Sequence, residues 1–163
     1  MKPIMQTRFG LPGEDGRMAE PPGNCWAACV ASILELPLDA VPDEAEFWRP
    51  GMTPRQSWTL YMDHVHRWLH ERGLVLIETR VSELFYEGPS DLFTPYCILS
   101  GPSPRNPAVS HAVVGRGIHV IHDPHESQRS LAGDPLKDWW YEFFVARNAA
   151  DAAESEASEA CDA

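Results

Sequence analysis

Two cysteines stand four residues apart in the stretch GNCWAAC (residues 23–29), where the end of a loop meets an apolar run. The apolar residues that follow recur at helical spacing, so we expect a helix that begins at Cys25. The free N–H groups and the dipole at a helix start stabilise a thiolate, which is the nucleophilic form of cysteine. Cys29 falls one turn inside the same helix, where a small buried hydrophobe is the simpler interpretation. Cys25 is therefore the candidate nucleophile.

A thiolate nucleophile requires a base, and that base requires a group that orients it. Four of the seven histidines lie in SHAVVGRGIHVIHDPHES, residues 110–127. β-Rich runs on both sides of Arg116-Gly117 predict two strands joined there by a two-residue hairpin turn. Such a hairpin brings the outer ends of its strands together, which would put Asp123 across the ladder from His111. A carboxylate there fixes the tautomer of an imidazole, so His111 is the candidate base and Asp123 its orienting group.

Two other combinations of these residue types suggest metal ligands. Asp63, His66 and His70 share a face of an expected helix, although solvated polar side chains are the simpler interpretation. His122 and His125, taken with the two cysteines, are the ligand types of a zinc site, but only two residues separate the histidines, fewer than in the usual histidine pairs of structural zinc sites. We therefore expect no metal and no cofactor.

The motifs NCWAACVASIL (residues 24–34), SHAVVG (110–115) and HDP (122–124) together resemble the papain-like cysteine peptidase superfamily. Cys-Trp-Ala at a helix start is similar to the papain nucleophile segment. His-Ala-Val-Val followed by Asp-Pro is similar to the bacteriocin-leader peptidase domains of peptide exporters and to small papain-like proteins of bacteria and their phages. The resemblance covers roughly residues 4–145. It implies Cys25 as nucleophile, His111 as general base and acid, and Asp123 as the orienting residue.

Papain-like enzymes also carry a glutamine upstream of the nucleophile, whose amide helps to stabilise the tetrahedral oxyanion. The resemblance points to Gln6, the only glutamine before Cys25, although it lies nineteen residues upstream behind a Gly/Pro-rich insertion. Asn24 and the backbone N–H of Cys25 are competing donors. Trp26 and Arg105 are the candidate substrate-binding residues. Arg105 lies in the loop that leads into His111 and suits an anionic group, with a solvated loop arginine as the alternative.

The elements expected to position these residues are helices first and strands afterwards. A first helix runs from Cys25 and ends before Pro37. A second begins after the N-cap Thr53, where Gln56 completes a capping box, carries one apolar stripe and ends near Gly73. Five β-rich runs follow, at residues 74–80, 96–101, 111–116, 118–123 and 139–145. This order predicts an α+β, papain-like domain in which the N-terminal helices pack on a mostly antiparallel sheet. The aromatic side chains of the last run are expected to form the core and edge of a terminal strand rather than a recognition platform.

The chain has 163 residues, enough for one domain but not comfortably for two. We expect a single papain-like catalytic domain over residues 1–148 and an acidic disordered tail over residues 149–163. The net charge of −11 argues against nucleic acid as a partner. No apolar run suits a signal peptide or a membrane span, so we expect a cytoplasmic protein, or one in the host cytoplasm if a phage encodes it. A reducing cytoplasm keeps cysteines as thiols.

The expected activity is thiol-dependent attack on an amide or thioester carbonyl, with an acyl-enzyme that water or an amine resolves. A peptidase, isopeptidase or amidase acting on a peptide, a protein or a small amide is the first expectation. The same three side chains also serve deamidases and acyl or peptidyl transferases, and they do not distinguish among these reactions. The alternative from another class is a non-catalytic papain-like module that binds a peptide or protein.

Overall fold

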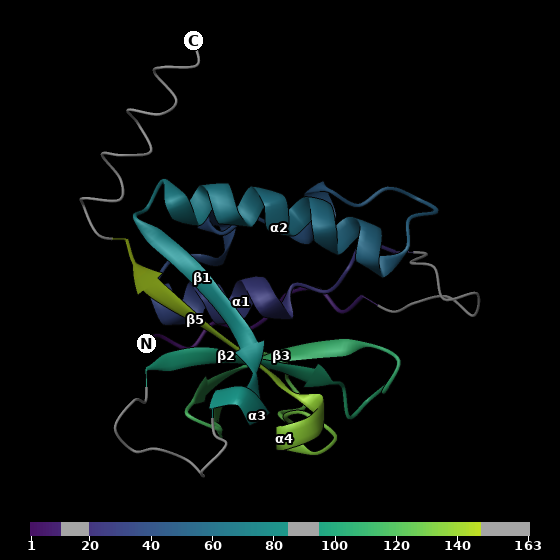
Figure 1. Cartoon of the computed structure of the whole chain (residues 1–163). Helices are drawn as coiled ribbons and strands as arrows, with labels where there is room; N and C mark the ends of the chain where they lie inside the picture. The colour runs from purple at the N-terminus through teal and green to yellow at the C-terminus, as the bar shows by residue number, and fades with distance from the viewer. Residues whose placement is uncertain (11–19, 85–94, 148–163) are drawn as a thin grey trace.

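The computed structural model of the chain describes residues 1–10, 20–84 and 95–147, and the predicted acidic tail at 149–163 lies outside them. The described residues form an α+β fold around a five-stranded antiparallel sheet with the strand order β1-β5-β2-β3-β4 (Figure 1). The helices are α1 (Cys25–Leu34), α2 (Pro54–His70), α3 (Val81–Leu84) and α4 (Pro135–Asp138), with 3₁₀ turns at Leu38–Ala40 and Glu44–Glu46. The strands are β1 (Leu74–Arg80), β2 (Tyr96–Pro102), β3 (Ser110–Arg116), β4 (His119–His122) and β5 (Trp140–Ala146).

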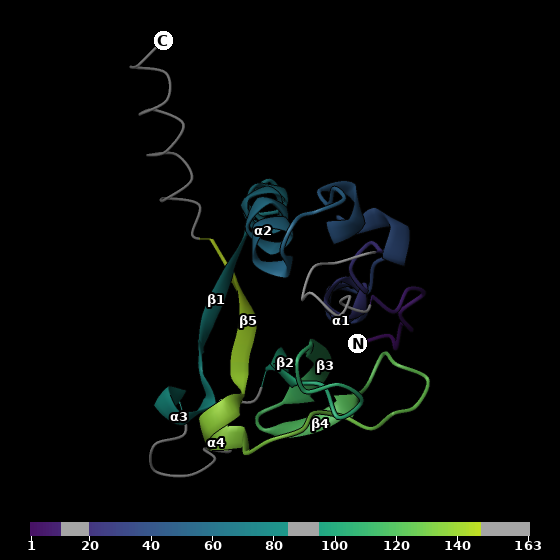
Figure 2. The same cartoon turned by 90° about the vertical axis from the view of Figure 1, so that its right-hand side faces the viewer.

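Helix α1 is the buried helix that begins at the candidate nucleophile. It lies against β2 and β3, while α2 lies beside it against β1 (Figure 2). Every residue from Trp26 to Ser32 is buried, as expected of a helix that is apolar all round. The helix ends where Glu35 adopts a left-handed conformation, with φ of 56°, and Pro37 follows shortly after.

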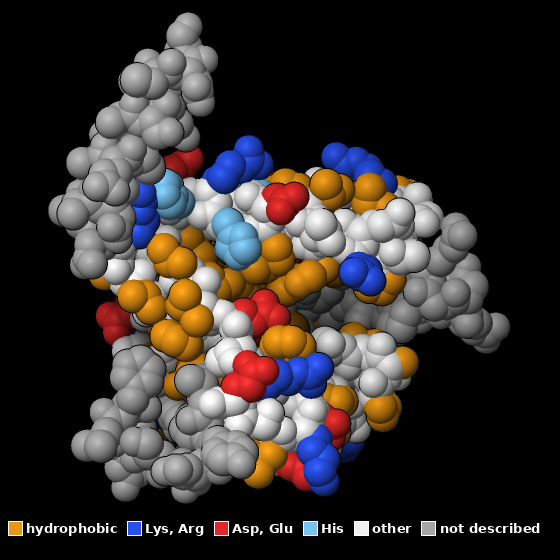
Figure 3. Space-filling view, in the orientation of Figure 1, with side chains coloured by type: hydrophobic (Ala, Val, Ile, Leu, Met, Phe, Trp, Pro, Cys, Tyr) orange, Lys and Arg blue, Asp and Glu red, His pale blue; other side chains and the backbone are white. Residues whose placement is uncertain are grey.

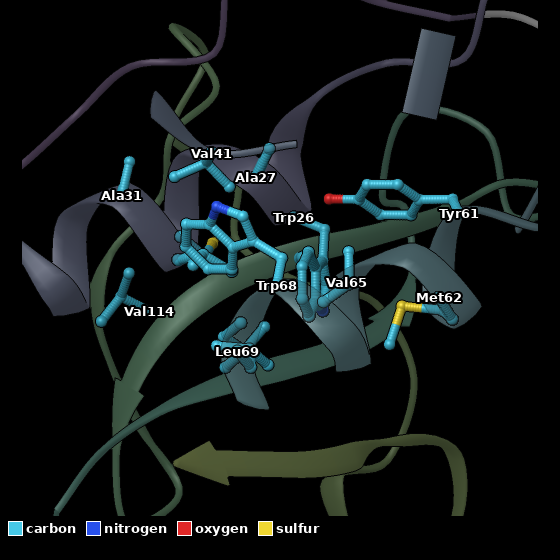
Figure 4. Close-up of a cluster of buried hydrophobic side chains, with 14 residues drawn as sticks. Trp26, Ala27, Ala31, Val41, Tyr61, Met62, Val65, Trp68, Leu69 and Val114 are labelled. Atoms are coloured by element: carbon cyan, nitrogen blue, oxygen red, sulfur yellow. The ribbon is translucent and has the colours of Figure 1, made fainter. Parts of the chain in front are cut away.

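Helix α2 has the predicted capping box, in which the side chains of Thr53 and Gln56 bond each other's backbone N–H groups. Its buried residues form one stripe, as predicted, and pack against Trp26 of α1 in the main core (Figure 4). Within the described parts of the chain, no helix combines the length and apolar character needed to cross a membrane.

The sheet has a hydrophobic core on each face. Along β2, Ile98 points into the core beneath α1 and α2, whereas Cys97 and Leu99 point into the second core with Trp139 and Val81. This alternation follows from the two-residue period of a strand. At the outer edge, β1 leaves Val75 and Ile77 exposed, and Figure 3 shows hydrophobic side chains gathered below α2, in the region where Figure 1 draws β1 and β5.

Two predictions about these elements need correction, and two short helices were not predicted. The last strand in the sequence, β5, lies inside the sheet between β1 and β2, because it has buried side chains on both faces, Tyr141 on one and Glu142 on the other. The β3–β4 turn consists of Gly117 and Ile118 rather than Arg116 and Gly117, with φ of 59° at Gly117. The short helices α3 and α4 were not anticipated, since four residues are too few for a periodic pattern.

Candidate active site

Three side chains from separate elements meet where α1 begins. Cys25 is the first residue of α1, His111 is the second residue of β3, and Asp123 follows β4 directly. The Nε2 atom of His111 lies 2.8 Å from Oδ1 of Asp123, and Cys25 is close enough to the same imidazole for its thiol to raise the pKa of the ring. Because Asp123 occupies Nε2, Nδ1 is the ring nitrogen left for the thiol. Cys25 and Asp123 therefore both lie beside His111, and Asp123 is hydrogen-bonded to it.

Asp123 is a buried carboxylate with three donors around it. Oδ1 accepts from the backbone N–H of His125, in addition to His111, and Oδ2 accepts from the backbone N–H of Ser130, both at 2.9 Å. Burial raises the pKa of Asp123, but the hydrogen bonds from His111, His125 and Ser130 outweigh it, so the net pKa is lowered. The carboxylate is thus ionised at neutral pH and accepts a hydrogen bond from the Nε2–H group of His111.

The electrostatics of His111 follow from the same contacts. The side chain is only 3% exposed, and this burial by itself lowers the pKa of the imidazole. The hydrogen bonds to Asp123 and Cys25, together with the charges of both partners, outweigh burial and raise the net pKa above the ordinary value of 6.5. His111 is therefore suited to hold a proton near neutral pH.

The contact between His111 and Asp123 does not arise from the predicted register. Val114 pairs with His122, and a bulge separates this pair from the rest of the β3–β4 ladder. The next pair along would be Val113 with Asp123, so His111 lies two residues beyond the position directly opposite the carboxylate. The two side chains meet diagonally, a distance that long side chains on neighbouring strands can span.

The cysteines differ in their surroundings, as predicted. Cys25 is half-buried, whereas Cys29 is fully buried and burial raises the pKa of its thiol well above the ordinary value. Burial likewise raises the pKa of Cys97 to about 12. Among the three cysteines of the described residues, Cys25 is the one that solvent reaches.

The N-terminal segment passes between α1 and the loop that follows β4 (Figure 2). On one side, the backbone N–H of Ile4 donates to Oγ of Ser32 in α1. On the other side, Nε2 of His122 donates to the carbonyl of Ile4 at 2.9 Å, and the N–H of Gln6 donates to the carbonyl of Pro124. His122, which was considered above as a zinc ligand, therefore holds this segment in place.

Gln6 comes next to the nucleophile despite its distance in sequence. Its Nε2 donates to the carbonyl of Arg8 at 2.9 Å, and the backbone N–H of Asn24 donates to the same carbonyl at 3.3 Å. The amide of Gln6 is thus beside the residue that precedes Cys25. Within the described residues, its Oε1 atom is buried without a hydrogen-bond partner.

The side chain of Asn24 binds the N-terminal segment. Its Oδ1 accepts from the backbone N–H groups of Thr7 and Arg8, and its Nδ2 donates to Oγ1 of Thr7. It makes no cap to α1, so the first N–H groups of that helix are not taken by a side-chain cap. The two predicted oxyanion donors therefore differ. The side chain of Asn24 is engaged with the N-terminal segment, whereas the backbone N–H of Cys25 lies at the helix start without a side-chain cap.

The backbones of residues 8–10 and 22–24 are pressed together at this point. A Cβ atom on Gly10 would come within 2.4 Å of the backbone nitrogen of Gly23, which is closer than real contacts allow. Glycine at position 10 therefore permits the close approach that sets the N-terminal segment beside Cys25.

The two predicted substrate-binding residues lie in different places. Trp26 is in the core with 5% of its surface exposed, and its Nε1 donates to Oε2 of Glu142 at 2.6 Å. Arg105 is on the surface near the site, where its guanidinium donates to Oγ of Ser127 at 3.0 Å. Arg105 is thus near the loop that carries His125, and Trp26 is buried in the core next to Cys25 in the chain.

Sequence reasoning missed two features of this region. Phe9 lies edge-on against the ring of His125, with 4.7 Å between the ring centroids, and no local pattern brings these residues together. Glu142 is a buried carboxyl group that accepts hydrogen bonds from Trp26 and from Ser100. A signal for Glu142 was present, because it is the only charged residue in the otherwise apolar run WWYEFFV.

No group of three or more His, Cys, Asp or Glu side chains in the described ranges is arranged to hold a metal ion. Comparisons with models of protein families, with curated proteins and with solved structures find no match to this chain. The geometry of the site is therefore the basis for a functional assignment.

Proposed function

We propose that this chain is a thiol-dependent hydrolase of papain-like fold, with Cys25 as nucleophile, His111 as general base and acid, and Asp123 as the orienting residue. The observation that supports this proposal is the hydrogen bond between His111 and Asp123, with Cys25 beside the same imidazole. Its members have the roles that covalent catalysis by a thiol requires: a nucleophile at a helix start, a base in contact with it, and a carboxylate that fixes the base.

The reaction begins when Nδ1 of His111 takes the proton of the Cys25 thiol. The sulfur adds to the carbonyl carbon of an amide, and the electron pair of the C=O bond moves onto oxygen. As the tetrahedral intermediate collapses, the C–N bond breaks and His111 returns its proton to the departing nitrogen. A water molecule, deprotonated by His111, then adds to the thioester and releases the acid and the free thiol.

Two groups are suited to stabilise the oxyanion. The backbone N–H of Cys25 lies at the start of α1, where no side-chain cap occupies it. The amide of Gln6 is held next to Asn24 by the carbonyl of Arg8, and one of its N–H bonds is not used by that contact. Donors that are already in place when charge develops lower the barrier most effectively.

We propose a peptide, a protein or a small amide as the substrate, because hydrolysis needs water rather than a second bound acceptor. The mechanism uses no metal and no cofactor. The cytoplasm is the proposed location, since its reducing conditions keep a catalytic cysteine as a thiol.

The reactivity of the thiols tests this proposal directly. At about pH 6, where ordinary thiols are almost fully protonated, we expect iodoacetamide to alkylate the protein once, at Cys25. The site of alkylation is read by mass spectrometry, and the rate is compared with that of glutathione. The Cys25→Ala variant should remain unlabelled in the same time. Labelling no faster than that of glutathione would instead favour a non-catalytic binding module on the same fold.

Asp123→Asn tests the orienting role. The negative charge of Asp123 helps to raise the pKa of His111, so its removal should lower the pKa of the imidazole measured by NMR titration. We expect turnover of p-nitrophenyl acetate to fall by about 10- to 100-fold, because the imidazole is less well oriented to activate water. Asp134→Asn, which changes an exposed carboxylate paired with Lys137, serves as the control. An unchanged His111 titration in Asp123→Asn would contradict the assignment.

A further inference from the structure

Three rings form a row that leads outward from the candidate nucleophile. His111, which lies beside Cys25, has the ring of His125 edge-on against it at 6.1 Å between centroids and an interplanar angle of 87°. The ring of Phe9 is in turn edge-on to His125, at 4.7 Å and 62°. The order from the inside outward is therefore Cys25, His111, His125, Phe9.

His125 is fixed in both position and tautomer. Its backbone N–H donates to Asp123, and its Nδ1 accepts from the backbone N–H of Ser127 at 3.0 Å. Burial, and next the charge of Arg105, lower the pKa of His125, which favours the neutral ring. With Nδ1 as an acceptor, the ring proton is on Nε2. The loop after β4 therefore presents His125 as a rigid, uncharged ring.

Phe9 is held beside the start of α1 by its neighbours in the chain. The carbonyl of Arg8 accepts from the backbone N–H of Asn24, and Gly10 packs against the backbone of Gly23. The side chain of Phe9 is nevertheless 45% exposed. One part of its ring is thus supported by His125, while the rest faces solvent next to the residue that precedes Cys25.

We propose that Phe9 is a specificity-determining residue, whose exposed ring binds an aromatic side chain of the substrate that acylates Cys25. The inference rests on the proposed function, because it assumes that a substrate reaches Cys25. An aromatic group on the substrate would extend the row of His111, His125 and Phe9 by one more ring. Because His125 holds Phe9 in place, binding loses little conformational freedom.

Two alkylating reagents of defined structure test this role without a known substrate. N-Phenyliodoacetamide carries an aromatic ring, and iodoacetamide does not. We measure the rate of alkylation of Cys25 by each reagent with mass spectrometry and divide the rate for N-phenyliodoacetamide by the rate for iodoacetamide. This ratio is then divided by the same ratio measured for glutathione. This quotient should be roughly 3 to 10 for the natural chain, the size expected of one aromatic contact.

Phe9→Ala should lower the quotient to about one, the value that glutathione has by definition. Phe9→Tyr should keep the quotient high, because the ring is retained. Tyr96→Ala is the matched control, since Tyr96 is also an exposed aromatic but stands at the opposite end of β2 from the pair Gly101–His111. The quotient of this control should equal that of the natural chain. His125→Ala should lower the quotient as well, because Phe9 loses its support.

The outcomes separate this inference from the proposed function. If Cys25 reacts no faster than glutathione with either reagent, the proposed function is wrong and the inference is lost with it. If Cys25 reacts rapidly but the quotient is near one, or Phe9→Ala leaves it unchanged, the role of Phe9 is wrong and the proposed function stands. Equal slowing of both reagents in Phe9→Ala would also overturn the inference, since it indicates a positioning effect.

Discussion

Replacing His111 with glutamine should slow acylation of Cys25 by p-nitrophenyl acetate by about 10²- to 10⁴-fold, the range for loss of a general base. Glutamine can still donate a hydrogen bond to Asp123, but it cannot take the proton of the thiol. The rate is measured from the release of p-nitrophenolate, and mass spectrometry locates the acetyl group on Cys25. Because Asp123 keeps its donors from His125 and Ser130, we expect the fold to be retained.

The matched control for this change is His119→Ala, which removes an exposed histidine from the neighbouring strand β4. Its acylation rate should equal that of the natural chain. A normal rate in His111→Gln would show that His111 is not the base, and His122 would be the next candidate. Unfolding of both histidine variants in urea is compared as well, so that a loss of rate is not mistaken for a loss of fold.

Replacing Glu142 with glutamine should stabilise the protein at about pH 8 by roughly 2–3 kcal/mol and have little effect at about pH 4.5. Burial raises the pKa of this carboxyl from 4.5 to about 7, and the hydrogen bonds from Ser100 and Trp26 offset only part of that rise. Glutamine can accept from Nε1 of Trp26 and donate to Oγ of Ser100, so the contacts survive while the charge is lost. Denaturation in urea at several pH values measures the difference.

The direction of this effect follows from proton binding. Between 4.5 and about 7 the unfolded chain loses the proton of Glu142 while the folded chain keeps it, so the free energy of unfolding falls as pH rises through this window. Burial also raises the pKa of Glu44 to about 7, so part of the pH dependence should persist in Glu142→Gln.

Glu78→Gln is the control, because Glu78 is an exposed carboxylate that pairs with Glu142 across β1 and β5 and helps to raise its pKa. The stability of this variant should keep its pH dependence, shifted to lower pH. If Glu142→Gln left the free energy of unfolding unchanged at every pH, the buried carboxyl would not be protonated in the folded state.

The local elements of the fold could be predicted because their causes are local. The capping box at Thr53 and Gln56 and the β-rich run at 74–80 depend on residues within a few positions of one another, and both agree with the structure. The position of β5 inside the sheet could not be predicted in this way, because strand order depends on pairings between segments far apart in the chain.

The candidate site shows the same division. Residue type and position were enough to select Cys25, since a thiol at the start of an apolar helix is chemically distinct from Cys29 one turn later. The predicted hairpin placed His111 and Asp123 near each other, but the strand register on which this prediction rested was incorrect. The bulge after Val114 and the turn at Gly117 and Ile118 changed the ladder, and the two side chains meet diagonally instead.

By itself, the sequence determined the order of helices and strands, the identity of the candidate nucleophile and the pair of groups suited to assist it. The tertiary structure alone decided that Gln6 lies beside Asn24 and that Trp26 is hydrogen-bonded to Glu142. It also decided that the ring of Phe9 packs edge-on against His125. The physical reason is that periodicity and capping act over one or two turns of chain. Contacts such as these depend on where a backbone passes after it has folded around the core.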